Sequence, residues 1–214
     1  EVDYEAVDNA LLKAIKRSSW WADEYLRGKR DDLSEAPGIW RRDSQFPDHV
    51  REVIKEVIRN NNWSWDQFES LTDYEAQRLP VVLGERLTRL RGWSIASLSD
   101  DMQDAFGLEE DTAVGIAAET SHNVLNTARE EAYEHMERSE EIVYDWVGPQ
   151  NHRTSQICEE IKAEIEDRGG AVTLPTLKQI LRQKAQKYED SGTPEKVEQW
   201  SPHRGCRHTL EKKG

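Results

Sequence analysis

The sequence contains very little cysteine. Among its 214 residues only Cys158 and Cys206 are cysteines, and they lie 48 positions apart. A metal site with three or four thiolate ligands is therefore excluded. Methionine and phenylalanine are also rare, with two and three residues, whereas there are eight tryptophans, which bury a large area per residue. We expect a folded chain with a lean core.

Long apolar runs are absent as well. No stretch approaches the ~20 apolar residues that a membrane-spanning helix needs. The first ten residues, EVDYEAVDNA, are acidic and do not resemble the apolar centre of a signal peptide. We therefore expect a soluble protein with no membrane partner.

The common catalytic motifs are missing too. The sequence has no glycine-rich phosphate loop, no G-x-S-x-G and no H-E-x-x-H. We therefore expect that the protein is not an enzyme. Cys158 as a nucleophile with His203 as its base remains an alternative, because a thiol beside an imidazole can be activated.

Positive charge is scarce and unevenly placed. The formal net charge is −13, and arginine outnumbers lysine by 18 to 11. Residues 178–214 carry nine basic and five acidic side chains, or +4, so residues 1–177 carry −17. Such an acidic body disfavours broad, non-specific DNA binding and permits at most a local basic contact. It also suits a protein hydrated in high salt, so a halophilic source is a hypothesis beside an ordinary acidic cytosolic protein.

Most of the chain has helical periodicity. The predicted helices cover 3–29, 48–60, a short segment up to 71, 72 to about 91 with a kink at Pro80, the segment GWSIASLSDDMQDAFGL, 111–137, 154–167 capped by Thr154, and 176–188. Residues 30–47 and 190–198 read as loops. Alternating or short apolar stretches predict strands over 141–147 and 171–174, and residues 200–210 are expected to be extended.

These elements predict a mostly α protein in three parts. Residues 1–91 form a helical docking region, residues 92–140 a helical core, and residues 141–214 a small α+β lobe. Two polar tracts, NHRTSQIC and WSPHRGCRHTL, bring both cysteines and several histidines to this lobe. We expect the two tracts to meet and close the lobe as a Cys/His clasp.

The clasp residues suit a structural zinc ion. Zinc takes four thiolate or imidazole ligands at tetrahedral angles. The candidate ligands are Cys158, His203, Cys206 and His208, with His152 as a spare. A Cys158–Cys206 disulfide, or two reduced and buried thiols with hydrogen-bonded histidines, are the alternatives.

Three further residues are expected to support the clasp. Arg153 and Thr154 lie just before Cys158, and Arg207 lies between two of the candidate ligands. The arginines can bind a carboxylate that orients the corner, for which Glu159 is a candidate, or they can bind DNA phosphates.

Four motifs in the second half of the chain resemble one known family. They are GWSIASLSDDMQDAFGL, AAETSHNVLNTAREEAY, VYDWVGPQNHRTSQIC and SPHRGCRHTL. In order and spacing they resemble the head-morphogenesis proteins of tailed phages and viruses, also called minor head or phage Mu F-like proteins. Three positions depart from the family pattern: Ser155 replaces the first cysteine of C-x-x-C, His208 replaces the last cysteine of C-R-C, and Asn151 replaces the acid before R-T.

The resemblance implies a structural component of a virus particle. Such a protein would be bound at the portal vertex inside the head, in several copies, and would act in head assembly, genome packaging or genome ejection. Its partners would be the portal protein, with the major capsid protein and packaged DNA as further candidates. It would be found in the virion, and in the host cytoplasm during assembly. The alternative is a zinc-stabilised nucleic-acid-binding or regulatory protein, which only the basic C-terminal stretch favours.

Overall fold

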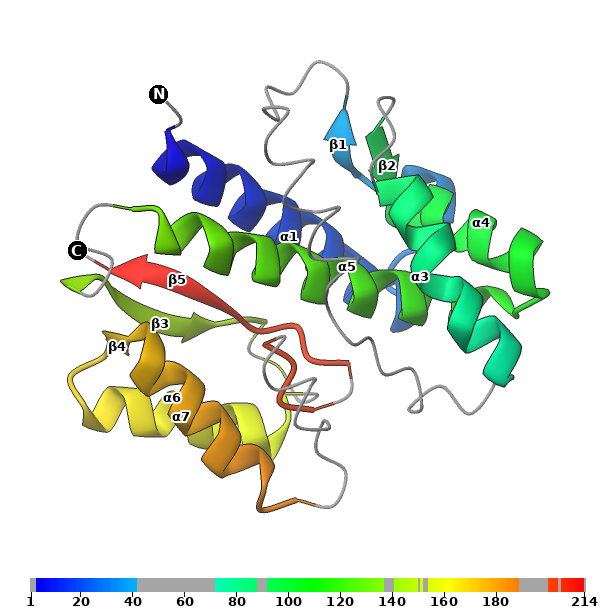
Figure 1. The fold of residues 1–214 in the computed structure, drawn as a ribbon. Coiled ribbons are helices and arrows are strands. Elements are labelled where there is room, and N and C mark those ends of the chain that lie inside the picture. Colours follow the sequence, from blue (N-terminus) through cyan, green and yellow to red (C-terminus); the bar gives the residue numbers. More distant parts are fainter. Residues whose placement is uncertain are drawn as a thin grey trace.

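The structure is a computed structural model, and it is mostly helical with a small antiparallel sheet near the C-terminus (Figure 1). It describes residues 3–41, 72–87, 92–136, 141–149, 151, 154–188, 200–203 and 205–213. The predicted helices over 48–60 and up to 71, and the predicted loop over 190–198, lie outside this range. Within the described residues, no helix is both long enough and apolar enough to cross a membrane.

Two long helices, α1 (Tyr4–Leu26) and α5 (Glu110–Glu134), pack side by side (Figure 1). The Asp3 carboxylate caps α1 by accepting a hydrogen bond from the Ala6 amide. The apolar stripe predicted for α1 is confirmed as buried: Leu11, Leu12, Ile15, Ser19 and Ala22. The side of α5 that meets this core is rich in alanine, which lets two helices approach closely: Ala113, Ala117, Ala128 and Ala132.

A third helix, α4 (Ile95–Phe106), completes this core by packing against α5. The Ser94 and Ser97 side chains form a capping box at its start, and Gly107 ends it with a positive φ of 66°. Leu98 and Met102 are fully buried, as the spacing predicts.

A small sheet beside this core departs from the prediction. β1 (Gly38–Arg41) pairs antiparallel with β2 (Gly92–Ser94), where the sequence indicates a loop and the start of a helix. Each strand is too short to carry a period-two pattern of its own, and the pairing joins segments far apart in the chain. The short 3₁₀ helix η1 (Leu33–Glu35) precedes β1, and α3 (Asp73–Leu87) continues as a helix through Pro80.

The C-terminal lobe is a three-stranded sheet with a helix pair on one face (Figure 1). β3 is the central strand and pairs antiparallel with both neighbours. The elements are β3 (Val143–Val147), α6 (Gln156–Asp167), β4 (Val172–Thr173), α7 (Leu174–Ala185) and β5 (Thr209–Lys213). The other face of the sheet turns toward α5, where the Tyr133 and Tyr144 rings lie 4.8 Å apart. The predicted α+β lobe is therefore confirmed.

One buried arginine joins the two halves of the molecule. Arg129 of α5 is fully buried, and its Nε donates to Asp8 Oδ1 of α1 at 2.6 Å. Its Nη1 donates to the Leu210 carbonyl at 2.7 Å and to Thr209 Oγ1 at 2.8 Å, both on β5. Its Nη2 also contacts the Tyr133 hydroxyl. Since a buried guanidinium is tolerated only when its charge and N–H groups are satisfied, these contacts hold α1, α5 and β5 together.

We expect Arg129→Met to lower the free energy of unfolding by about 3–5 kcal/mol, because it leaves the Asp8 carboxylate buried without a counter-ion. Urea denaturation followed by circular dichroism measures this loss. The double variant Asp8→Leu/Arg129→Met should be less destabilised than the sum of the two single variants. Additive losses would contradict the pairing.

Candidate metal centre

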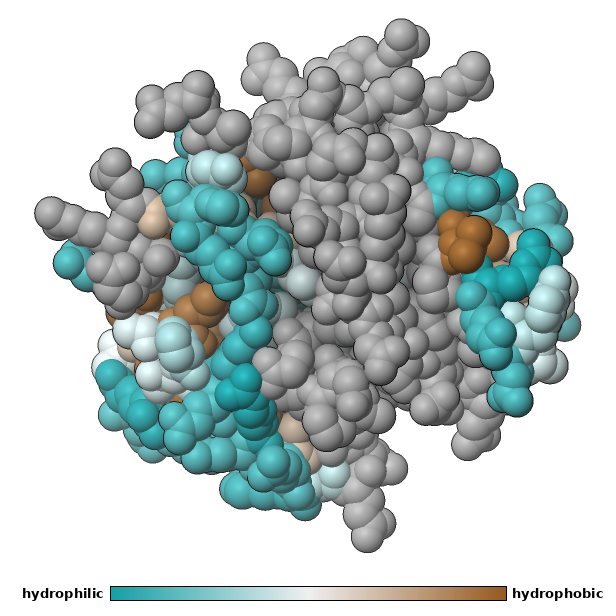
Figure 2. Space-filling model, viewed as in Figure 1, coloured by the Kyte–Doolittle hydropathy of each residue, from teal (hydrophilic) through white to brown (hydrophobic). Residues whose placement is uncertain are grey.

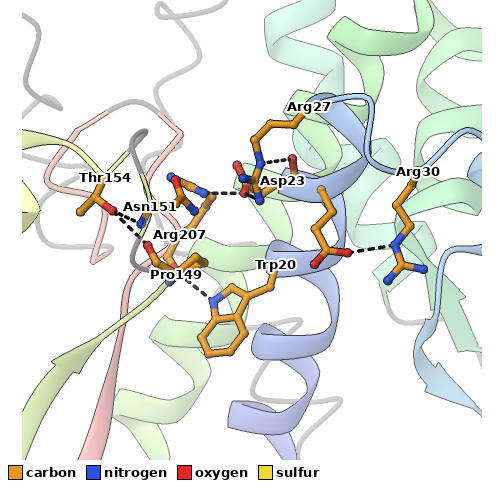
Figure 3. A network of polar contacts seen from close by, with 9 residues as sticks. Trp20, Asp23, Arg27, Arg30, Pro149, Asn151, Thr154 and Arg207 are labelled. Carbon is orange, nitrogen blue, oxygen red and sulfur yellow. Dashed lines mark hydrogen bonds and ion pairs between the residues drawn. The ribbon is translucent and has the colours of Figure 1, made fainter.

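Cys158 lies in the first turn of α6, and a serine sets its position. Ser155 is the N-cap of α6, and its Oγ accepts a hydrogen bond from the Cys158 amide at 3.1 Å. The predicted cap, Thr154, is wrong by one residue. The Thr154 hydroxyl instead binds the turn before the helix, donating to the Pro149 carbonyl and accepting from the Asn151 amide, each at 3.1 Å (Figure 3). Arg153 and His152 lie outside the described residues.

His203 and Cys206 are held by a tight turn. The Cys206 amide donates to the His203 carbonyl at 3.3 Å, and Gly205 between them has a φ of 66°. A residue with a side chain is strained at this φ, so glycine suits the turn. The Gly205 amide also donates to Glu119 Oε2 of α5 at 3.3 Å, which attaches the turn to the helical core.

The two tracts meet in a group of three ligands. Cys158 Sγ lies 3.2 Å from His203 Nε2 and 3.7 Å from Cys206 Sγ. All three ligand atoms lie within 4.8 Å of one another, and the group could hold a metal ion. Both cysteines are free thiols, because a disulfide would need an Sγ–Sγ distance of about 2.05 Å.

The fourth predicted ligand, His208, lies beside this group rather than within it. Its ring is buried and stacks on Trp146 with a centroid distance of 6.1 Å. It also packs against Gly148, where an added Cβ would come within 2.5 Å of the ring. The imidazole is close enough to Cys158 to help lower the pKa of that thiol. Among the described residues its Nε2 has no hydrogen-bond partner.

The surroundings of the two thiols shift their pKa values in opposite directions. The pKa of Cys158 is well below its ordinary value, because Cys206, His203 and His208 stabilise the thiolate more than burial disfavours it. Burial and the neighbouring Cys158 raise the pKa of Cys206 instead. Cys158 is therefore the more readily deprotonated of the two thiols, and a bound cation would favour the thiolate form of both.

Buried polar residues of α5 lie beside this centre, and they were not predicted from the sequence. Six consecutive or nearly consecutive polar residues there are buried: Glu119, Thr120, Ser121, His122, Asn123 and Asn126. His122 Nδ1 lies 3.3 Å from Ser19 Oγ, and its Nε2 accepts from Asn126 Nδ2 at 3.0 Å. A signal was present, because Glu119, His122, Asn126 and Arg129 recur at three- and four-residue spacing.

Arg207, the third predicted support of the clasp, is bound by α1. Its Nη1 forms a 2.6 Å ion pair with Asp23 Oδ2, and its backbone carbonyl accepts a 3.3 Å hydrogen bond from Trp20 Nε1 (Figure 3). Glu159 is the carboxylate expected from the sequence. The structure instead supplies Asp23, which lies at the other end of the chain.

Comparisons with known proteins give no relatives. A scan of protein-family models, a search of curated proteins and a search of solved structures each return no match.

We expect His122 to make the protein less stable as the pH falls from 6.5 toward 3. Burial, followed by the nearby His208, lowers the pKa of His122 to about 3, whereas an unfolded histidine titrates near 6.5. Between these values the unfolded chain binds the extra proton, so stability is complete above about 6.5 and declines below it.

His122→Gln should flatten this dependence by up to about 1.4 kcal/mol per pH unit, measured by urea denaturation between pH 4.5 and 7. The exposed His135 provides the control, and His135→Gln should keep the wild-type slope. An unchanged slope in His122→Gln would show that His122 does not stay neutral in the fold.

Proposed function

We propose that this chain is a structural minor head protein of a tailed virus, bound at the portal vertex inside the head. It would act in head assembly, genome packaging or genome ejection. The support is the resemblance carried by the four sequence motifs, together with one structural observation. Three of these motifs converge on one another in the fold.

The second and third motifs both make their contacts with the fourth, SPHRGCRHTL. From the second motif, Glu119 binds Gly205 and Arg129 binds Leu210. From the third, Trp146 stacks on His208, and Cys158 meets His203 and Cys206. Motifs that lie far apart in the sequence but contact one another in the fold are typical of a structural core that related proteins share. This convergence supports the resemblance as a likeness of architecture.

The ligand group suits zinc. Two thiolates and an imidazole are ligands that zinc prefers. A tetrahedral zinc with Zn–S bonds of about 2.3 Å separates two sulfurs by about 3.8 Å. The observed Sγ–Sγ distance is 3.7 Å. Cys158, His203 and Cys206 would hold the ion, with His208 adjacent as the candidate fourth ligand, and the ion would fasten the C-terminal lobe.

A structural role agrees with the way in which the buried polar side chains of the site contact one another. Cys158 and Cys206 are buried, and His203 Nε2 is directed at the Cys158 sulfur. His122 is fully buried between Ser19 and Asn126. These groups bind each other within the protein, so we propose that the chain is not an enzyme.

The basic residues of the C-terminal lobe are largely paired with acids. Lys178 pairs with Glu130, Lys184 with Glu164, and Arg207 with Asp23. Paired cations attract phosphates less than free ones do, so this pattern does not favour the nucleic-acid-binding alternative. On the face seen in Figure 2, the described surface is mainly hydrophilic with small hydrophobic patches.

We expect purified protein to contain one zinc ion per chain, measured by inductively coupled plasma mass spectrometry after dialysis against metal-free buffer. Cys158→Ser should lose most of it, because the group would keep only one thiolate. Ser94→Ala removes the cap of α4 and does not touch the ligands or α6, so it should retain the ion. Metal-free wild-type protein from zinc-supplemented cells would refute the zinc proposal.

We expect cryo-electron microscopy of virus particles carrying this chain to place it at the unique portal vertex. A version with a small C-terminal tag can be located by gold labelling on the same particles. Chains distributed evenly over the shell would contradict portal binding. Particles that lack the chain altogether would contradict a virion role.

A further inference from the structure

The segment that carries two candidate ligands has little regular structure of its own. Residues 205–208 lie between the turn at His203 and the start of β5 at Thr209. Their positions therefore depend on contacts with other elements. Glu119 of α5 holds the Gly205 amide, and Gly148 receives the His208 ring. Arg207, which lies between the two candidate ligands Cys206 and His208, is held by α1.

α1 holds Arg207 at two points. The Trp20 indole N–H donates to the Arg207 carbonyl, and the Asp23 carboxylate pairs with the Arg207 guanidinium (Figure 3). One contact is to the backbone and the other is to the end of the side chain. Together they restrain both the peptide plane after Arg207 and the direction of its side chain. Because Arg207 follows Cys206 and precedes His208, this restraint also limits the positions of both neighbouring ligands.

The attachment is electrostatically strong because it is little exposed. The side chains of Asp23 and Arg207 are 6% and 14% exposed. Arg27, one turn further along α1, places its own Nη2 2.6 Å from the same Asp23 oxygen. One carboxylate thus pairs with two guanidinium groups. Loss of its charge would leave two cations side by side in a poorly solvated place, and Arg207 would be displaced.

We propose that Asp23 is a positioning residue for the metal centre: through Arg207 it holds Cys206 and His208 in the metal-binding arrangement, and so couples α1 to metal affinity. This inference rests on the proposed metal site. Residues that orient ligands without touching the ion typically change metal affinity by about 10–100-fold when they are mutated. Because the coupling is reciprocal, a bound metal must also stabilise the docking of α1.

The test is Asp23→Asn in the full chain, which keeps the size of the side chain and removes its charge. Zn²⁺ affinity is measured by competition with a chromophoric chelator, and Co²⁺ spectra report thiolate coordination. We expect affinity to fall at least tenfold, with thiolate–cobalt absorption weakened. In the wild type, Zn²⁺ should slow amide hydrogen exchange in α1, and Asp23→Asn should lose that protection.

Two matched controls separate positioning from general damage. Glu24→Gln removes the neighbouring exposed ion pair to Arg30, which does not reach the ligand segment. Glu211→Gln removes the Lys16–Glu211 pair, which also joins α1 to the C-terminal strand but lies beyond the ligands. Both controls should bind Zn²⁺ within about threefold of the wild type, because surface pairs contribute little.

A second variant keeps the proposal testable if Asp23→Asn is poorly folded. Trp20→Phe keeps an aromatic ring but removes the indole N–H that donates to the Arg207 carbonyl, and it should weaken Zn²⁺ binding severalfold with the fold intact by circular dichroism. Unchanged affinity in folded Asp23→Asn, or in Trp20→Phe where Asp23→Asn is misfolded, would overturn the proposal. Equal losses in the two control variants would also overturn it. A wild type that binds no Zn²⁺ would refute the metal site itself, and this failure is visible before any variant is made.

Discussion

The buried guanidinium of Arg129 imposes the main constraint on this fold. A cation in the interior must be matched by a carboxylate and by acceptors for its remaining N–H groups, and these come from three elements. Asp8 arrives from α1, Tyr133 from α5 itself, and Thr209 and Leu210 from β5. Asp8 balances the charge, while the hydrogen bonds of Nη1 require β5 as well. The helical core and the C-terminal lobe have separate apolar clusters, yet both must be in place before Arg129 can be buried.

The same face of α5 contributes to the candidate metal centre about two to three turns nearer the start of the helix. Glu119 and His122 precede Arg129 on this helix. Glu119 accepts from the Gly205 amide, and His122 contacts Ser19 of α1. A chain with few large aliphatic residues thus joins its halves with polar contacts where another protein would use apolar packing. Such contacts are directional, and they specify one position of residues 205–210 along α5. A metal ion at Cys158, His203 and Cys206 would add to this scheme rather than replace it.

Apolar periodicity predicted most of the described elements, because each pattern lies within one segment. The stripe of α1 and the inward positions of α4, α6 and α7 were all found this way. The patterns could not reveal β1 and β2, whose identity depends on pairing across a long separation. Nor could they reveal the buried side chains of His122 and Asn126, since polar residues at helical spacing usually mark a solvated face. The ligand set was predicted from chemistry alone, and three members meet. His208 stands apart because the space beside Gly148 admits its ring. Asp23 was missed because nothing near it in the sequence points to Arg207.

The contacts that join α1 to β5 have a consequence for folding during synthesis. The Asp8 carboxylate emerges from the ribosome long before Leu210, and Arg129 in between has no complete set of partners until both are present. Contacts of such long sequence separation slow folding. During synthesis α1 and α5 can associate through their apolar faces, but the Nη1 group of Arg129 lacks its acceptors until β5 is added. A chain cut short before Trp200 would therefore lack two acceptors for Arg129, one strand of the sheet and the Cys/His clasp. The fold in this way distinguishes chains that include β5 from chains that end before it.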